Sequence, residues 1–109
     1  MRRTGPNLEP SDVLELLHEQ MASLPRAQRS ALQRALILAR KVPVADSPSE
    51  HVIAVASFGD RLLYWSDIEE GWEIEAPDER GRIPSRGSNQ FALAQALWQE
   101  LRTPRRQLA

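Results

Sequence analysis

The chain has 109 residues, of which 41% are hydrophobic and 27% charged, and its formal net charge is −1. This length and composition are typical of one globular domain. The absence of cysteine excludes disulfides, thiolate chemistry and sulfur-ligated zinc. No apolar run approaches the roughly 18 residues of a membrane span, and no apolar segment follows the basic start at residues 1–3, as it would in a secretory signal. We therefore expect a cytoplasmic protein.

The N-terminal part of the chain predicts two helices behind a flexible leader at residues 1–8. Apolar residues recur at helical spacing over 10–23, which indicates a first helix with one buried stripe. Pro25 interrupts this pattern and suits the first turn of a second helix, which we expect to continue to about Arg40. The small alanines of the second helix allow close approach, so the two helices should form an antiparallel hairpin.

The middle of the chain predicts a hairpin of two strands. A connecting loop at 42–50 precedes the Val- and Ile-rich segment 51–58. Gly59–Asp60 fits a two-residue turn, because glycine accepts the positive φ that the first turn position needs. The cross-strand pairs expected in this register are Phe58 with Arg61, Ala56 with Leu63, Val55 with Tyr64, Ala54 with Trp65, and Ile53 with Ser66.

A third strand is predicted at 72–76, after a tight link at 67–71 in which Gly71 takes a left-handed conformation. Strict alternation places Trp72 and Ile74 on one face and Glu73 and Glu75 on the other. We expect the first pair to be packed and the two glutamates to face solvent, as antiparallel sheets allow.

The C-terminal part predicts a polar loop at 77–87, in which Arg82–Ile83 could add a short edge pairing. A third helix should begin at Ser88 or Asn89 and end near Arg102, ahead of a flexible basic tail at 103–109. The residues expected to pack it against the sheet are Phe91, Ala94, Leu97, Trp98 and Leu101. The order α-α-β-β-β-α predicts an α+β domain over 9–102, a three-stranded antiparallel meander packed on one face by helices.

Charge is distributed very unevenly along the chain. Residues 60–79 hold eight of the fifteen acids and one base, Arg61, for a net −7, while residues 1–59 sum to +1 and residues 80–109 to +5. This negative field predicts docking to a basic surface of a protein partner. Nucleic acid is an unlikely partner, because the C-terminal arginines can neutralise the acidic segment instead. The residues expected to make the contact are Tyr64, Asp67, Glu69, Glu70, Glu73 and Glu75.

Two other chemistries suit the same carboxylates less well. Asp67, Glu69 and Glu70 could bind a hard cation, but the alternating acids of a calcium loop are missing. A pair of carboxylates could cleave a glycosidic bond, but three short strands offer little room for a deep cleft. His18 and His51 lack the spacing of metal ligands. We therefore expect no catalytic residues, no metal and no cofactor.

The segment Ser66–Trp72, followed after a loop by Asn89–Gln90 at a helix start, resembles small bacterial proteins of unassigned role, some of them among candidate toxin-immunity proteins. The resemblance implies no catalytic residues. The leading hypothesis is a small non-enzymatic bacterial protein with an immunity-like or regulatory role. The alternative is a structural homodimer or assembly subunit that uses an apolar sheet face made of Ile53, Val55 and Leu62.

Overall fold

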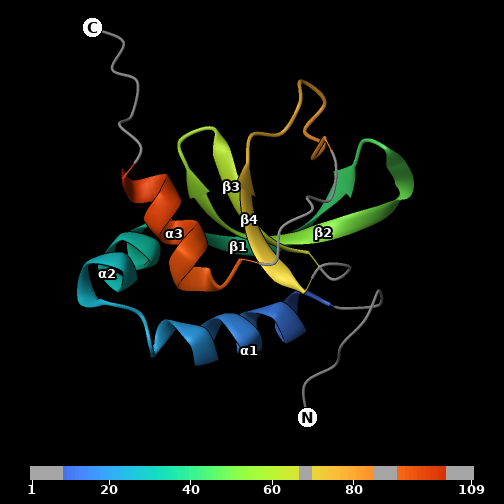
Figure 1. Ribbon diagram of the computed structural model, residues 1–109. Coiled ribbons are helices and arrows are strands. Elements are labelled where there is room, and N and C mark those ends of the chain that lie inside the picture. The colour runs from blue at the N-terminus through green and yellow to red at the C-terminus, as the bar shows by residue number, and fades with distance from the viewer. Residues whose placement is uncertain (1–8, 67–69, 85–90, 103–109) are drawn as a thin grey trace, which may run out of the picture.

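The computed structural model describes residues 9–66, 70–84 and 91–102 (Figure 1). The fold belongs to the α+β class, as the sequence predicts, but the antiparallel sheet has four strands in the order β1-β2-β3-β4 rather than three. The elements are α1 (Pro10–Met21), α2 (Arg26–Ala35), β1 (Leu36–Val44), β2 (Ser47–Phe58), β3 (Arg61–Ser66), β4 (Gly71–Glu75) and α3 (Leu93–Arg102).

The additional strand, β1, occupies residues that the sequence assigned to the second helix and the following loop. Helix α2 ends at Ala35, and Leu36 already has an extended backbone. Arg40 pairs with Ala54 and Val42 with Val52. The prediction of a helix to Arg40 is wrong, because pairing with β2 outweighs the local helical preference of this segment.

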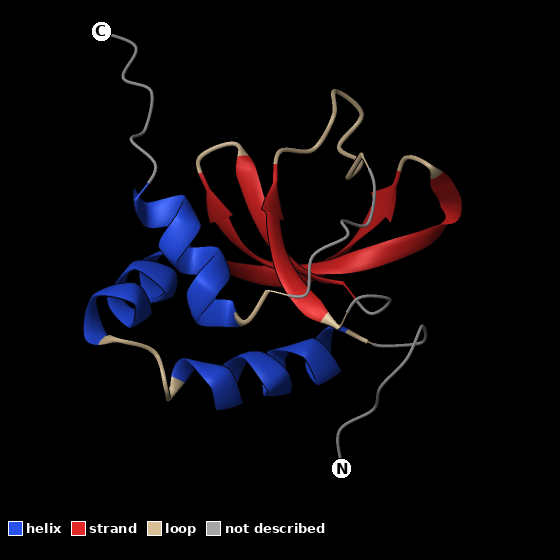
Figure 2. Ribbon diagram, in the orientation of Figure 1, coloured by secondary structure: helices blue, strands red, loops and turns tan. Residues whose placement is uncertain are grey.

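The three helices lie on one side of a strongly curved sheet (Figure 2). Helix α1 packs against β1 and β2, α2 against β2 and α3, and α3 against β4. The predicted antiparallel hairpin of the first two helices is therefore not formed. Each helix instead uses its own apolar stripe to cover part of the sheet.

The β2–β3 hairpin has the predicted turn, and Gly59 has a positive φ of 68°. Phe58 pairs with Arg61 and Ala56 with Leu63, as expected. Beyond these pairs a register shift between Ala54 and Ala56 moves the partners by one residue. The pairs there are Ala54 with Tyr64 and Ile53 with Trp65. A bulge at Val55 causes this difference, because it places an additional residue on one strand.

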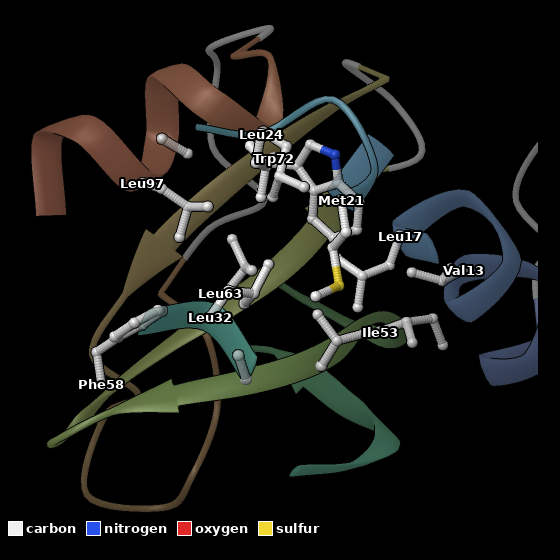
Figure 3. Close-up of a cluster of buried hydrophobic side chains, with 14 residues drawn as sticks. Val13, Leu17, Met21, Leu24, Leu32, Ile53, Phe58, Leu63, Trp72 and Leu97 are labelled. Carbon is white, nitrogen blue, oxygen red and sulfur yellow. The ribbon is translucent and has the colours of Figure 1, made fainter. Parts of the chain in front are cut away.

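The main core fills the space between the helices and the sheet (Figure 3). Burying each large side chain of this kind stabilises the fold by about 1.5–3 kcal/mol. The indole N–H of Trp72 donates a hydrogen bond of 2.9 Å to Oε1 of Gln20, which ties β4 to α1. The buried side chains of this core include Val13 and Leu17 of α1, Leu32 of α2, Ile53, Phe58, Leu63 and Trp72 of the sheet, and Leu93 and Leu97 of α3.

The predicted packing of the α3 region is confirmed in part, since Leu97 is buried in the main core and Phe91 and Ala94 pack against it. Leu93, Ala96 and Leu97 are buried, whereas Trp98 is 54% exposed and Leu101 42% exposed. The expectation that Trp98 and Leu101 lie against the sheet is therefore wrong. The apolar residues of α3 span an arc of about 200°, which is wider than the buried face, so their spacing alone did not determine which of them would be buried.

A second core lies on the sheet face that carries no helix. Ile83 is fully buried there and arrives from the loop after β4. Its N–H donates to the carbonyl oxygen of Pro43 at 2.9 Å, and the N–H of Ala45 donates to the Ile83 carbonyl at 2.8 Å. The predicted edge pairing at Ile83 is thus confirmed. The full second core comprises Val42, Val44, Val52, Ala54, Leu62, Tyr64 and Ile83.

Candidate functional site

The six residues predicted to bind a partner do not form one exposed patch. Glu70 is exposed in the link between β3 and β4, Glu75 is half-buried, and Tyr64 is fully buried. Glu73 is only 6% exposed. Asp67 and Glu69 lie outside the described residues. The prediction that both glutamates of β4 face solvent is wrong for Glu73, which is buried, and holds only in part for Glu75, which is half-buried.

The alternation along β4 is nevertheless the predicted one. Trp72 is fully buried and Ile74 packs against the same core, so Glu73 and Glu75 occupy the opposite face. The prediction that this face is open to solvent was wrong because other parts of the chain cover it. The curved sheet and the Ile83 loop enclose a second core there, and Glu73 is buried at its margin.

Three side chains on this face form what we call the acidic cluster: Tyr64, Glu73 and Glu75. Tyr64 of β3 pairs directly with Glu73 of β4, while Leu62 pairs with Glu75. The Tyr64 hydroxyl reaches diagonally across the strands and donates a hydrogen bond of 3.1 Å to Oε1 of Glu75. Diagonal neighbours in antiparallel strands are within reach of an aromatic side chain, so the register itself brings these groups together.

The surroundings of the acidic cluster disfavour the ionised forms of Glu75 and Tyr64 and raise the pKa of both groups. Burial raises the pKa of Glu75, and the charge of Glu73 raises it further, although the Tyr64 hydrogen bond and Arg61 act in the opposite direction. Burial also raises the pKa of Tyr64 far above its ordinary value, and the two carboxylates add to the effect. Tyr64 therefore remains a hydrogen-bond donor, and an ionised Glu75 sits in surroundings that favour a nearby cation.

Arg61, the one base of the acidic segment, has partners of its own. Its Nε donates to Oε1 of Glu100 in α3 at 3.0 Å, and its terminal nitrogen donates to the carbonyl oxygen of Ile74 at 2.9 Å. These contacts link the start of β3, directly after the β2–β3 turn, to β4 and α3. Sequence reasoning missed the pair, because Glu100 lies 39 residues away.

The loop that delivers Ile83 is built around Asp78. Its Oδ1 accepts hydrogen bonds of 2.9 Å from the backbone N–H groups of Arg80 and Arg82, and its Oδ2 accepts one of 3.0 Å from Nε of Arg82. The Arg82 backbone bond is the main cause of a lowered pKa at Asp78. Short polar residues that bond to their own backbone are typical of turns, so the segment from Asp78 to Gly81 indicates a turn from sequence alone.

Within the parts of the chain that the structure describes, no group of three or more His, Cys, Asp or Glu side chains is arranged to hold a metal ion. The same residues contain no helix that is both long enough and apolar enough to cross a membrane.

Comparison with known proteins finds no family model that matches this sequence, and it finds no match among curated proteins or solved structures.

Proposed function

We propose that this chain is a small non-enzymatic binding protein that accepts a cationic side chain of a protein partner at the acidic cluster. One observation carries the proposal. Glu75 is half-buried, hydrogen-bonded to Tyr64, and held where both burial and Glu73 raise its pKa. A lysine or arginine placed beside Glu75 would relieve this unfavourable arrangement.

Electrostatics favours such a contact in two ways. Glu75 is already oriented by Tyr64, so an incoming guanidinium meets a fixed acceptor, and charge-assisted bonds of this kind are stronger than neutral ones. Asp60 and Glu79 are exposed in the turn before β3 and the loop after β4. The pairing of Leu62 with Glu75 places both connections at the same end of the sheet as Glu75, where their charges would steer a basic partner.

An immunity-like or regulatory role is consistent with this mode of binding. A negatively charged surface that captures one basic side chain can cover a basic active site or compete with its natural ligand. In this role the chain would act by occlusion and would catalyse nothing itself.

The test is an NMR titration with a short arginine-rich peptide. We expect shifts at Tyr64 and Glu75 that are lost in Glu75→Gln and retained in Glu15→Gln, which removes an exposed carboxylate on α1, away from this surface. The affinity should increase as the pH rises through the raised pKa of Glu75, because only the carboxylate attracts the cation. Equal weakening by both substitutions, or a flat pH profile, would refute the proposal.

A homodimer or assembly subunit is the second candidate, on a different surface from the one the sequence predicted. Ile53 and Val55 belong to the core beneath the helices, so they cannot form the expected apolar docking face. The exposure of Trp98 and Leu101 on α3 favours self-association through this helix instead. The molar mass should then rise with concentration and should return to the monomer value in Trp98→Ser.

A further inference from the structure

Helix α2 presents a strip of arginines on the side of the molecule that carries the helices. At 100° per residue, Arg26, Arg29 and Arg34 fall within an arc of about 140°. Arg26 and Arg34 are exposed and Arg29 is half-buried, while Leu32 of the same helix is fully buried in the core. Helix α2 contains no acid. We call Arg26, Arg29 and Arg34 the arginine strip.

The charges of the arginine strip are not balanced by neighbouring carboxylates. Within the described parts of the chain the strip forms no ion pair, whereas Arg61 is paired with Glu100 and Arg82 with Asp78. The three guanidinium groups are therefore available to carboxylates of another molecule.

The opposite imbalance is found at the end of the sheet that holds Glu75. Asp60 in the turn before β3 and Glu79 in the loop after β4 are exposed, and Glu75 is half-buried. Among the described residues these three carboxylates form no ion pair, and Arg80, beside Glu79, forms none either. We call Asp60, Glu75 and Glu79 the acidic end.

The sheet separates the arginine strip from Glu75. The helices lie on one side of the sheet (Figure 2), and Glu75 is on the face of β4 opposite Trp72, which packs beneath the helices. The strip also points away from the sheet, because Leu32 occupies the inward side of α2. The arginines of one molecule therefore cannot reach Glu75 of the same molecule, and a contact that joins them has to form between molecules.

The two surfaces have similar lengths. Arg26 and Arg34 are eight residues apart, which is about 12 Å along a helix. Asp60 precedes the β3 partner of Glu75 by two residues, or about 7 Å along a strand. Glu79 follows Glu75 by four residues, which is at most about 14 Å. One α2 helix is therefore long enough to span the acidic end.

We infer that the arginine strip binds the acidic end of a second copy of this chain, so that copies associate head to tail. The inference rests on the proposed function, because it names α2 of another copy as the source of the cationic side chain that Glu75 accepts. The planar donors of a guanidinium group match a carboxylate in geometry. Because the interface joins two different surfaces, each added copy leaves one strip and one acidic end free.

The distribution of charge favours this occupant over other ones. Both halves of the contact are on the same chain, with three unpaired arginines on one surface and three unpaired carboxylates on the other among the described residues. A symmetric contact between two α2 helices is disfavoured, because it would place arginines against arginines. An α3 dimer would be built on Trp98 and Leu101, and salt would not weaken it.

Sedimentation equilibrium of the full chain measures this association. We expect the average mass to rise with protein concentration at low ionic strength and to return to that of one chain in high salt, which screens exposed charge pairs. Arg34→Glu should weaken association about tenfold, through the loss of one charge pair and added repulsion. Arg40→Glu is the matched control, because it changes the charge equally on an exposed residue of β1, at the sheet edge away from β4.

Mixing two variants separates a head-to-tail contact from a symmetric one. Arg34→Glu damages the strip and leaves the acidic end intact, while Asp60→Arg does the reverse. Each variant alone should stay close to the mass of one chain, whereas an equimolar mixture should form a complex of two chains. The circular dichroism spectrum of each variant establishes that a loss of association is not a loss of folding.

A mass of one chain at every concentration in low salt would overturn the inference. So would equal weakening by Arg34→Glu and Arg40→Glu, or a mixture that associates no better than its components. Association that persists in high salt and is lost in Trp98→Ser would assign the contact to α3 instead.

The arginine-rich peptide distinguishes failure of this inference from failure of the proposed function. If the peptide binds at Glu75 while the wild-type chain stays single, the proposed function stands and only the head-to-tail contact is refuted. If the peptide does not bind at Glu75, both are refuted. When both hold, added peptide should dissociate the assembled chains, because it competes with α2 for the same carboxylate.

Discussion

Replacing Ile83 by alanine should destabilise the protein strongly, although the residue lies in a loop. Ile83 is fully buried in the second core and is held by two backbone hydrogen bonds to the Pro43–Ala45 segment. The substitution keeps these bonds and removes three carbon atoms from a closed apolar cluster. Truncating a buried isoleucine to alanine costs about 2–5 kcal/mol, so we expect a loss of about 3 kcal/mol in the free energy of unfolding.

Urea denaturation followed by circular dichroism measures this change directly. For a chain of this size about 3 kcal/mol corresponds to a decrease in Tm of about 12 °C or more. Leu38→Ala is the control, because Leu38 is 91% exposed and its truncation should change stability by less than about 0.5 kcal/mol. A cost below about 1 kcal/mol for Ile83→Ala would mean that the second core is not closed by this loop and that Glu73 is open to solvent.

Three further predictions concern single contacts. Trp72→Phe should lower the free energy of unfolding by about 1–3 kcal/mol in urea denaturation, because it removes the hydrogen bond to half-buried Gln20 and part of a fully buried side chain. Glu75→Gln should flatten the dependence of stability on pH. Folding raises the pKa of Glu75, so the protonated side chain stabilises the folded state fully in acid. This stabilisation is lost as the pH rises above about 4.5, the ordinary value, and through the raised pKa of the folded protein. A steeper profile in the variant would contradict this sign. Gly81→Ala should lower Tm by about 4–8 °C, because a backbone φ of +77° costs an alanine about 1 kcal/mol even though the new Cβ meets no atom within 4 Å.

Local patterns predicted several elements correctly, with clear physical reasons. The Gly59–Asp60 turn, the alternation that buries Trp72, and the edge pairing of Ile83 are all found in the structure. The turn and the alternation depend on residues within a few positions of one another, whereas the Ile83 pairing joins segments 39 residues apart. The tight link before β4 was expected to bend at Gly71, but the positive φ belongs to Glu70, at 53°.

The prediction of the candidate site was less complete, because burial depends on distant segments. Sequence alone placed Glu73 and Glu75 on the face opposite Trp72, which is where they lie. It could not show that Ile83 and β1 would cover that face and leave Glu75 alone near the surface. The exposure of Leu36 and Leu38 was missed for a related reason, since both were assigned to a helix that in fact ends at Ala35.

The amino-acid sequence by itself determined the α+β class, the polarity of charge along the chain, and the side of β4 that faces the helices. These properties follow from composition and from alternation between neighbouring residues. Only the tertiary structure decided that Leu36–Val44 forms a strand, that a bulge at Val55 shifts the register, and that one carboxylate of the pair is buried. Pairing and burial of this kind bring together residues far apart in the chain, and no local pattern records which of them will meet.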